Sequence, residues 1–235
     1  MTTVSDSPAR DPAWLALVYF LAYMAWLFFT LEGEVEHWPT MVLIPLALIA
    51  AFHTGSIRSR LGQALRSVGL RPDRPARGLA LTLGLGLGVC LFQISFSRTA
   101  EDIIALLSSA RALVAVPATL VFLLLLTGLT EETLFRGYLQ TRLERWTGSR
   151  LWGLLISSVL FGLYHLPYAY LNPRWPSAGD WPAAFPAALG QGIPGGLILG
   201  GLFLYTGKNL YMPILLHAFV DLLPAAVMLK FSING

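Results

Sequence analysis

Apolar runs of about 20 residues recur along the chain, and such a run is the length that a helix needs to cross roughly 30 Å of hydrocarbon. Of the 235 residues, 55% are apolar and only 12% are charged, which exceeds what a water-soluble domain requires. The runs are continuous rather than alternating, so they favour helices over the strands of a transmembrane β-barrel. We therefore predict an all-α fold, a polytopic transmembrane helical bundle.

Seven spans are expected, at residues 14–31, 38–52, 79–97, 112–129, 151–171, 184–206 and 210–229. The second is the shortest and contains Pro45, so a tilted or re-entrant segment is an alternative to a full crossing there. The first is longer than the apolar region of a signal peptide and no small-residue cleavage site follows it, which favours a retained helix. We divide this single membrane domain into N-terminal helices with a basic loop, residues 1–111, and a C-terminal core, residues 112–235.

The positions of Lys and Arg predict the orientation, because cytoplasmic loops carry an excess of these residues. With a cytoplasmic N-terminus and seven crossings, all but four of the 16 Lys and Arg residues fall on the cytoplasmic side. The four on the other side are Arg98, Arg111, Arg174 and Lys230. This bias explains the net charge of +3 without a nucleic-acid partner, and it places the basic loop at residues 58–77 on anionic headgroups.

Three polar motifs interrupt the apolar helices, and an ionisable side chain in hydrocarbon costs several kcal/mol unless it is paired or hydrated. They are TEETLFR at residues 130–136, FGLYH at residues 161–165 and HAFVD at residues 217–221. On a helix, Glu132 and Arg136 are four residues apart and can form an ion pair, as can His217 and Asp221. Glu131 is left without a partner on its own helix, and the histidines of the other two motifs are candidate donors to it.

Helix lengths predict that the three motifs meet. If residues 112–146 form one helix that reverses at Gly148, then Glu131 and His165 both lie 17 residues from the turn (148 − 131 and 165 − 148). At 1.5 Å per residue this distance is about 25 Å. His217 follows the next cytoplasmic turn, so we expect the three side chains to converge in the cytoplasmic half of the bilayer.

The motifs resemble those of the CAAX-protease and bacteriocin-processing family (CPBP, also called Abi), a family of intramembrane endopeptidases. The resemblance covers residues 112 onward and extends to the glycine-rich stretch at residues 195–201 and to Pro213 before the third motif. Each motif alone is weak evidence, whereas three in the family's order on apolar helices are strong evidence. One position departs from the family pattern, because the last motif often ends in Asn and this chain has Asp221.

The resemblance implies a membrane-embedded protease in which Glu131 and His165 hold and activate a water molecule. His217, with Asp221 beside it, would stabilise the oxyanion of the tetrahedral intermediate. Three further residues would support the site: Glu132, Arg136 and Phe161. Amide hydrolysis needs such an activated water and donors at the developing negative charge. The implied substrates are membrane-associated or lipid-modified proteins or peptides, at a bacterial or archaeal cell membrane. The count of Lys and Arg predicts that the N-terminus and the active-site side face the cytoplasm.

Two alternatives follow from the same residues. Glu131, His165, His217 and Asp221 could instead bind zinc, since two histidines with carboxylates can leave an open coordination position. We favour a mechanism without a cofactor because the HExxH spacing is absent. The second alternative is a non-catalytic membrane protein, either a bacteriocin-immunity-type or helix-scaffolding factor or a proton-relaying transporter. The inverted repeat typical of transporters is not found between the two halves of the sequence.

Overall fold

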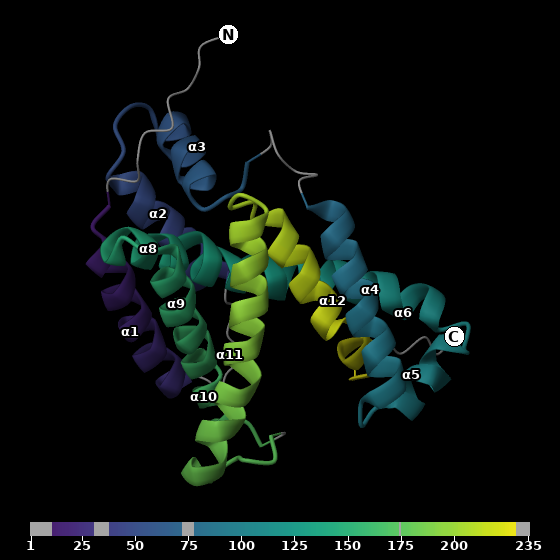
Figure 1. The fold of residues 1–235 in the computed structure, drawn as a ribbon. Helices are drawn as coiled ribbons and strands as arrows, with labels where there is room; N and C mark the ends of the chain where they lie inside the picture. Colours follow the sequence, from purple (N-terminus) through teal and green to yellow (C-terminus); the bar gives the residue numbers. More distant parts are fainter. Residues whose placement is uncertain (1–10, 31–37, 72–77, 174, 229–235) are drawn as a thin grey trace.

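The computed structural model describes residues 11–30, 38–71, 78–173 and 175–228, and every regular element in these ranges is a helix. Six helices are long and apolar enough to cross a membrane. They are α1 (Ala13–Thr30), α4 (Leu79–Phe96), the composite helix Ala112–Thr147, the pair α9 (Arg150–Tyr164) and α10 (Leu166–Leu171), α11 (Trp181–Tyr205) and α12 (Tyr211–Met228). The expected polytopic helical bundle is confirmed (Figure 1).

The second expected span is a shorter apolar helix, Pro39–Ala51. It consists of the π-helical turn η1 (Pro39–Leu43) and α2 (Ile44–Ala51), and Pro45 lies where the two segments join. At 1.5 Å per residue it covers roughly 20 Å, which is less than the hydrocarbon thickness. Because α1 and α4 both start at the upper end of the bundle in Figure 1, this short helix still returns the chain to that end.

The longest helix, Ala112–Thr147, runs obliquely through the bundle (Figure 1). Its segments are α6 (Ala112–Phe122), the π-helical η2 (Leu123–Gly128), α7 (Leu129–Glu132), the π-helical η3 (Thr133–Gln140) and α8 (Thr141–Thr147). Gly128 does not interrupt it; an added Cβ there would lie 2.8 Å from the carbonyl oxygen of Ile214, so glycine permits close contact with α12. The helix ends at Gly148, which adopts the left-handed conformation (φ 67°) that reverses the chain into α9.

Glycines bring α11 into close contact with α9. An added Cβ at Gly192 would lie 2.4 Å from the Cα atom of Gly162, and one at Gly196 would lie 2.7 Å from the Cα atom of Ser158. This is the packing that small residues spaced four apart allow between membrane helices. It fixes α9, which carries the second polar motif, against α11.

A proline frees a backbone acceptor on α12 that α4 then binds. Pro224 lies inside α12 and has no N–H for the carbonyl four residues earlier, that of Val220. The Nε2 atom of Gln93 on α4 donates to this carbonyl at 2.6 Å. The contact holds α4 beside the third polar motif.

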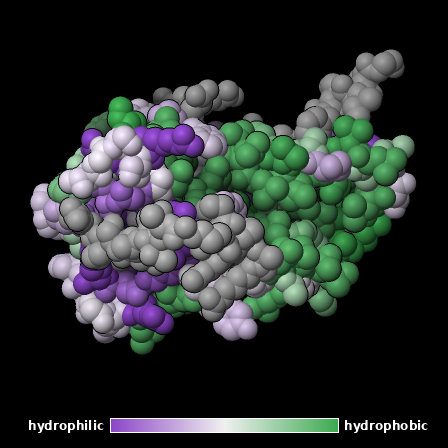
Figure 2. All heavy atoms as spheres, turned by 90° about the horizontal axis from the view of Figure 1, so that it is seen from above, coloured by the Kyte–Doolittle hydropathy of each residue, from purple (hydrophilic) through white to green (hydrophobic). Residues whose placement is uncertain are grey.

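One end of the bundle is basic. α3 (Ile57–Ser67), α8 and the turn between α11 and α12 all lie at the upper end in Figure 1. The described cations near this end are Arg58, Arg60, Arg66, Arg71, Arg142, Arg145, Arg150 and Lys208, whereas Arg98 and Arg111 flank α5 (Ala100–Leu107) at the other end. Viewed from above, hydrophilic residues gather on the side of α3 and α8, and the side of α4 and α6 is hydrophobic (Figure 2).

Two points qualify the sequence-based count of cations. Arg136 and Arg142, which the count assigned to the cytoplasmic side, are each buried with 1% of their surface exposed, so neither bears on orientation. Five others lie outside the described residues: Arg10, Arg74, Arg77, Arg174 and Lys230.

Candidate active site

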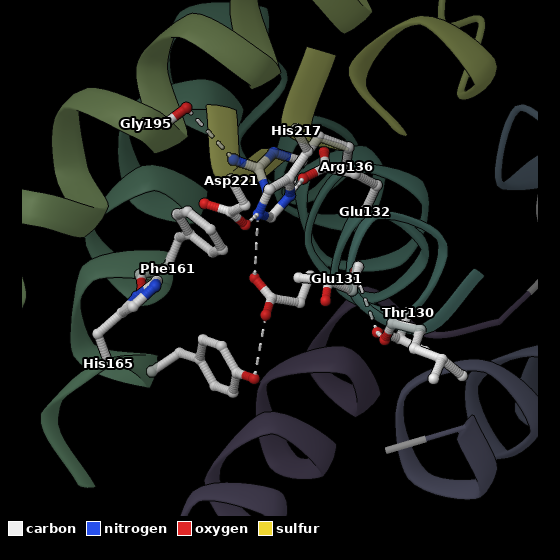
Figure 3. Close-up of polar contacts among 12 residues, drawn as sticks. Thr130, Glu131, Glu132, Arg136, Phe161, His165, Gly195, His217 and Asp221 are labelled. Carbon is white, nitrogen blue, oxygen red and sulfur yellow. Dashed lines mark hydrogen bonds and ion pairs between the residues drawn. The ribbon is translucent and has the colours of Figure 1, made fainter. Parts of the chain in front are cut away.

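The three polar motifs come from three parts of the bundle that face one another (Figure 3). Glu131 and Glu132 lie on α7, between the π-helical segments η2 and η3. Such segments often occur at functional sites, because the extra residue per turn re-aims the side chains around it. His165 ends α9, where Pro167 in the first turn of α10 starts a new helix. His217 and Asp221 lie on α12.

Glu132 binds two cationic or donor groups with one carboxylate oxygen. Its Oε1 atom lies 2.9 Å from Nη1 of Arg136 and 2.7 Å from Nδ1 of His217, and its side chain is fully buried. The pairing with Arg136 is the one that the helical spacing predicts. The bond to His217 joins residues 85 apart in the sequence and was not expected. Charge-assisted bonds of this length fix the orientation of the imidazole ring.

Arg136 is held by more than its carboxylate. Its Cζ atom lies 4.2 Å from the centroid of the Phe161 ring, and its Nη2 atom is 3.5 Å from the carbonyl oxygen of Gly195. The same Phe161 ring packs edge-on against His165, with ring centroids 4.8 Å apart. Phe161 therefore lies between Arg136 of the ion pair and His165, and contacts both.

His217 lies among three carboxylates. Its Nε2 atom is 3.4 Å from Oδ2 of Asp221 and 3.7 Å from Oε2 of Glu131, while Nδ1 faces Glu132. A doubly protonated imidazole could donate from both ring nitrogens in this position. Oε2 of Glu131 is buried and has no hydrogen-bond partner among the described residues, so it is available to a further donor.

His165 faces the same cavity as Glu131. Its Nδ1 atom lies 2.7 Å from the carbonyl oxygen of Phe161, which can only accept, so Nδ1 carries the hydrogen. In the neutral ring, Nε2 is then an acceptor. A cavity of about 270 Å³ adjoins both groups, and it is lined by Leu126, Thr127, Thr130, Glu131, Tyr164, His165, Tyr168 and Trp175.

Residues 113–223 match the family described as Rce1-like, type II CAAX prenyl endopeptidase, and the matched residues contain all three motifs. These residues form a CPBP-family core. With its apolar helices, the chain is an integral multi-pass membrane protein, and the match supports a CAAX-protease-like endopeptidase. No curated protein and no solved structure matches the chain.

Two site residues of this CPBP protein were not found from the sequence. The Tyr164 hydroxyl donates to Oε1 of Glu131 at 3.4 Å, and the Tyr168 hydroxyl lies 3.3 Å from that of Tyr164. Tyr164 occupies a variable position of the FxxxH motif, directly before the histidine, and Tyr168 follows one helical turn later. Their spacing of four residues places them on one helical face, which is a signal that the sequence did contain.

The placement of the four candidate ligands bears on the zinc alternative. In the described parts of the CPBP chain, no group of three or more His, Cys, Asp or Glu side chains is placed to hold a metal ion. Nδ1 of His217 is bound to Glu132, and Nδ1 of His165 is bound to a backbone carbonyl. Both bonds leave Nε2 of each ring free, as in many metal-binding histidines, so it is the separation of the four side chains, and not these hydrogen bonds, that disfavours a zinc site here.

Proposed function

We propose that this CPBP protein hydrolyses peptide bonds in membrane-associated or lipid-modified proteins or peptides, with a water molecule activated by Glu131 and His165. The observation that carries the proposal is Oε2 of Glu131, a buried acceptor that forms no hydrogen bond with a described side chain, in a residue that lines a cavity together with His165. A buried acceptor needs a donor, and a water molecule in a polar cavity can supply one.

The proposed reaction uses each group in the protonation state that its neighbours favour. The water donates one hydrogen to Glu131 and is oriented by the acceptor Nε2 of His165, and the resulting hydroxide attacks the scissile carbonyl. His217, oriented by its hydrogen bond to Glu132, faces the developing oxyanion in this proposal, and an imidazolium N–H can donate to that oxygen. Glu131 then transfers its proton to the leaving amine, which returns the site to its initial state.

The buried ion pair supports the reacting groups in this proposal. Glu132 orients His217, Arg136 balances the charge of Glu132, and Phe161 covers the pair. Breaking a buried pair by removal of one partner leaves an uncompensated charge and costs about 3–5 kcal/mol. We therefore assign these three residues to support rather than to the chemical step.

The test is cleavage of a panel of membrane-anchored reporter peptides by purified protein, with wild type compared to Glu131→Gln, with and without a chelator. We expect Glu131→Gln to lower the cleavage rate by about 10²–10⁴-fold, the usual contribution of a general base, and chelation to have no effect. Glu144→Gln is the matched control, because Glu144 lies on the same long helix but pairs with Lys208 and Arg150 outside the site.

Loss of cleavage with chelator and recovery with zinc would assign the same residues to a metalloprotease. Cleavage retained by folded Glu131→Gln protein would contradict the proposed mechanism. A folded wild-type protein that cleaves no reporter in the panel would favour the non-catalytic alternative.

A further inference from the structure

Three tyrosines from three helices meet beside Glu131. Tyr164 of α9 donates to Oε1 of Glu131, and Tyr168 of α10 lies within 3.3 Å of the Tyr164 hydroxyl. Tyr23 of α1 stacks on Tyr164, with ring centroids 6.2 Å apart and an interplanar angle of 21°. Tyr23 and Tyr164 are both 3% exposed, so this cluster is packed inside the bundle.

The number of hydroxyl hydrogens in the cluster determines which tyrosine donates and which accepts. A tyrosine hydroxyl has one hydrogen and can accept further hydrogen bonds. When Tyr164 donates to Glu131, it can only accept from Tyr168. A buried network that satisfies its members in this way rigidifies the groups at its end. With Oε1 of Glu131 held by Tyr164, the other oxygen, Oε2, is directed toward His217.

α1 is fixed firmly enough to hold its tyrosine in place. Just before α1, Asp11 accepts two hydrogen bonds from Arg142 of α8, at 2.8 and 3.0 Å, and both side chains are buried. Further along α1, Phe20 packs edge-on against Phe135 of η3 with centroids 6.0 Å apart. α1 therefore contacts the site's own long helix, although it lies outside residues 113–223, the part that matches the family.

We propose that Tyr164, held by Tyr23 and Tyr168, is a positioning residue for Glu131. Through Tyr23, α1 then contributes to catalysis. The proposal rests on the proposed role of Glu131 as the base. The tyrosines act through the carboxylate: they set which of its oxygens faces the water and keep the side chain in one orientation.

The experiment measures kcat and KM for reporter cleavage by the full-length protein and by Tyr164→Phe, which keeps the ring and its stacking but removes the hydroxyl. We expect kcat to fall by about 10- to 100-fold, as for the loss of a hydrogen bond to a charged group, with KM within about threefold of wild type. Tyr23→Leu, which removes the stacked ring, should lower kcat less, in the same direction. Tyr19→Phe is the matched control on α1, because that hydroxyl binds the carbonyl of Thr40 and not a group of the tyrosine cluster or Glu131; its kcat should stay within about twofold.

A second comparison separates positioning from general packing. In Glu131→Asp the shorter side chain has already lost the bond to Tyr164, so adding Tyr164→Phe should reduce the residual kcat by less than about threefold. An equal loss in both backgrounds, or an unchanged kcat in Tyr164→Phe alone, would overturn the proposal. Either result leaves the role of Glu131 intact if Glu131→Gln is inactive, whereas an active Glu131→Gln would remove the proposed function itself.

Discussion

Asp221 stands where the CPBP motif often has Asn, and its neighbours indicate what the position needs. Its Oδ2 atom is 3.4 Å from Nε2 of His217, and 40% of its side chain is exposed. Asp and Asn both offer an oxygen that can accept from an imidazole N–H. We propose that the position needs this acceptor oxygen more than it needs the charge.

We therefore expect Asp221→Asn to keep kcat/KM within about threefold of wild type, and Asp221→Leu, which is similarly branched but has no acceptor, to lose about tenfold or more. Reporter cleavage by the two variants, with melting temperatures compared to confirm folding, is the measurement. If Asn costs as much as Leu, the position requires a charge, a proton or a metal ion, and the hydrogen-bonding role is wrong.

Among the helices, the contact between α9 and α11 has the least tolerance for added atoms. α9 carries Phe161 and His165, and α11 supplies the carbonyl of Gly195 that faces Arg136. The two helices approach so closely at Gly192 that a methyl group would meet backbone atoms of Gly162 at 2.4 Å, where no flexible side chain can move away. A shift of α11 there would displace both partners of the site.

Gly192→Ala should consequently lower the melting temperature and reduce cleavage, since overpacking of this kind costs about 1–3 kcal/mol. Gly190→Ala on the same helix is the control, because an added Cβ there meets no atom within 4 Å and alanine favours the helix. Thermal unfolding in detergent and reporter cleavage test the pair. Equal melting temperatures for the two variants would show that the bundle accommodates the methyl group.

For the whole molecule, two expectations from the sequence conflict: a cytoplasmic N-terminus and a cytoplasmic active-site side. The basic residues near α3 and α8 favour a cytoplasmic upper end in Figure 1, together with the N-terminus. The cavity beside Glu131, however, is bordered by Trp175, in the connection between α10 and α11 at the lower end. If the cavity opens beside Trp175, it opens at the end of the bundle opposite to the N-terminus. The N-terminus and the opening then cannot both face the cytoplasm. We propose the charge-based orientation, which places Trp175 on the outer side.

Cysteine labelling tests this orientation. Cys90 is the single cysteine, so Cys90→Ala provides a background for new cysteines at Arg58, Ser108 and Ala178, all exposed. We expect a membrane-impermeant maleimide to label Ala178→Cys and Ser108→Cys in intact cells, and Arg58→Cys only after permeabilisation. The reverse pattern would place the basic end outside and the cavity edge at Trp175 in the cytoplasm.

Several features of this protein follow from the sequence without its tertiary structure. Continuous apolar runs require helices, because hydrocarbon offers the backbone no other hydrogen-bond partner. The reversal at Gly148 and the equal spacing of Glu131 and His165 from it depend only on helical geometry, and the structure places both side chains at one cavity. The pair Glu132–Arg136 follows from the spacing of four residues.

The tertiary structure decided which groups from distant segments share a partner. Helical spacing assigns Glu132 to Arg136 alone, whereas the fold brings His217 to the same oxygen. It also places Tyr23, from a helix that no motif marks, against Tyr164. Periodicity along one helix fixes which side chains share a face, but helices in a bilayer are apolar all round, so the sequence does not encode which faces meet. Close packing between the helices settles that, and with it the surroundings of Glu131.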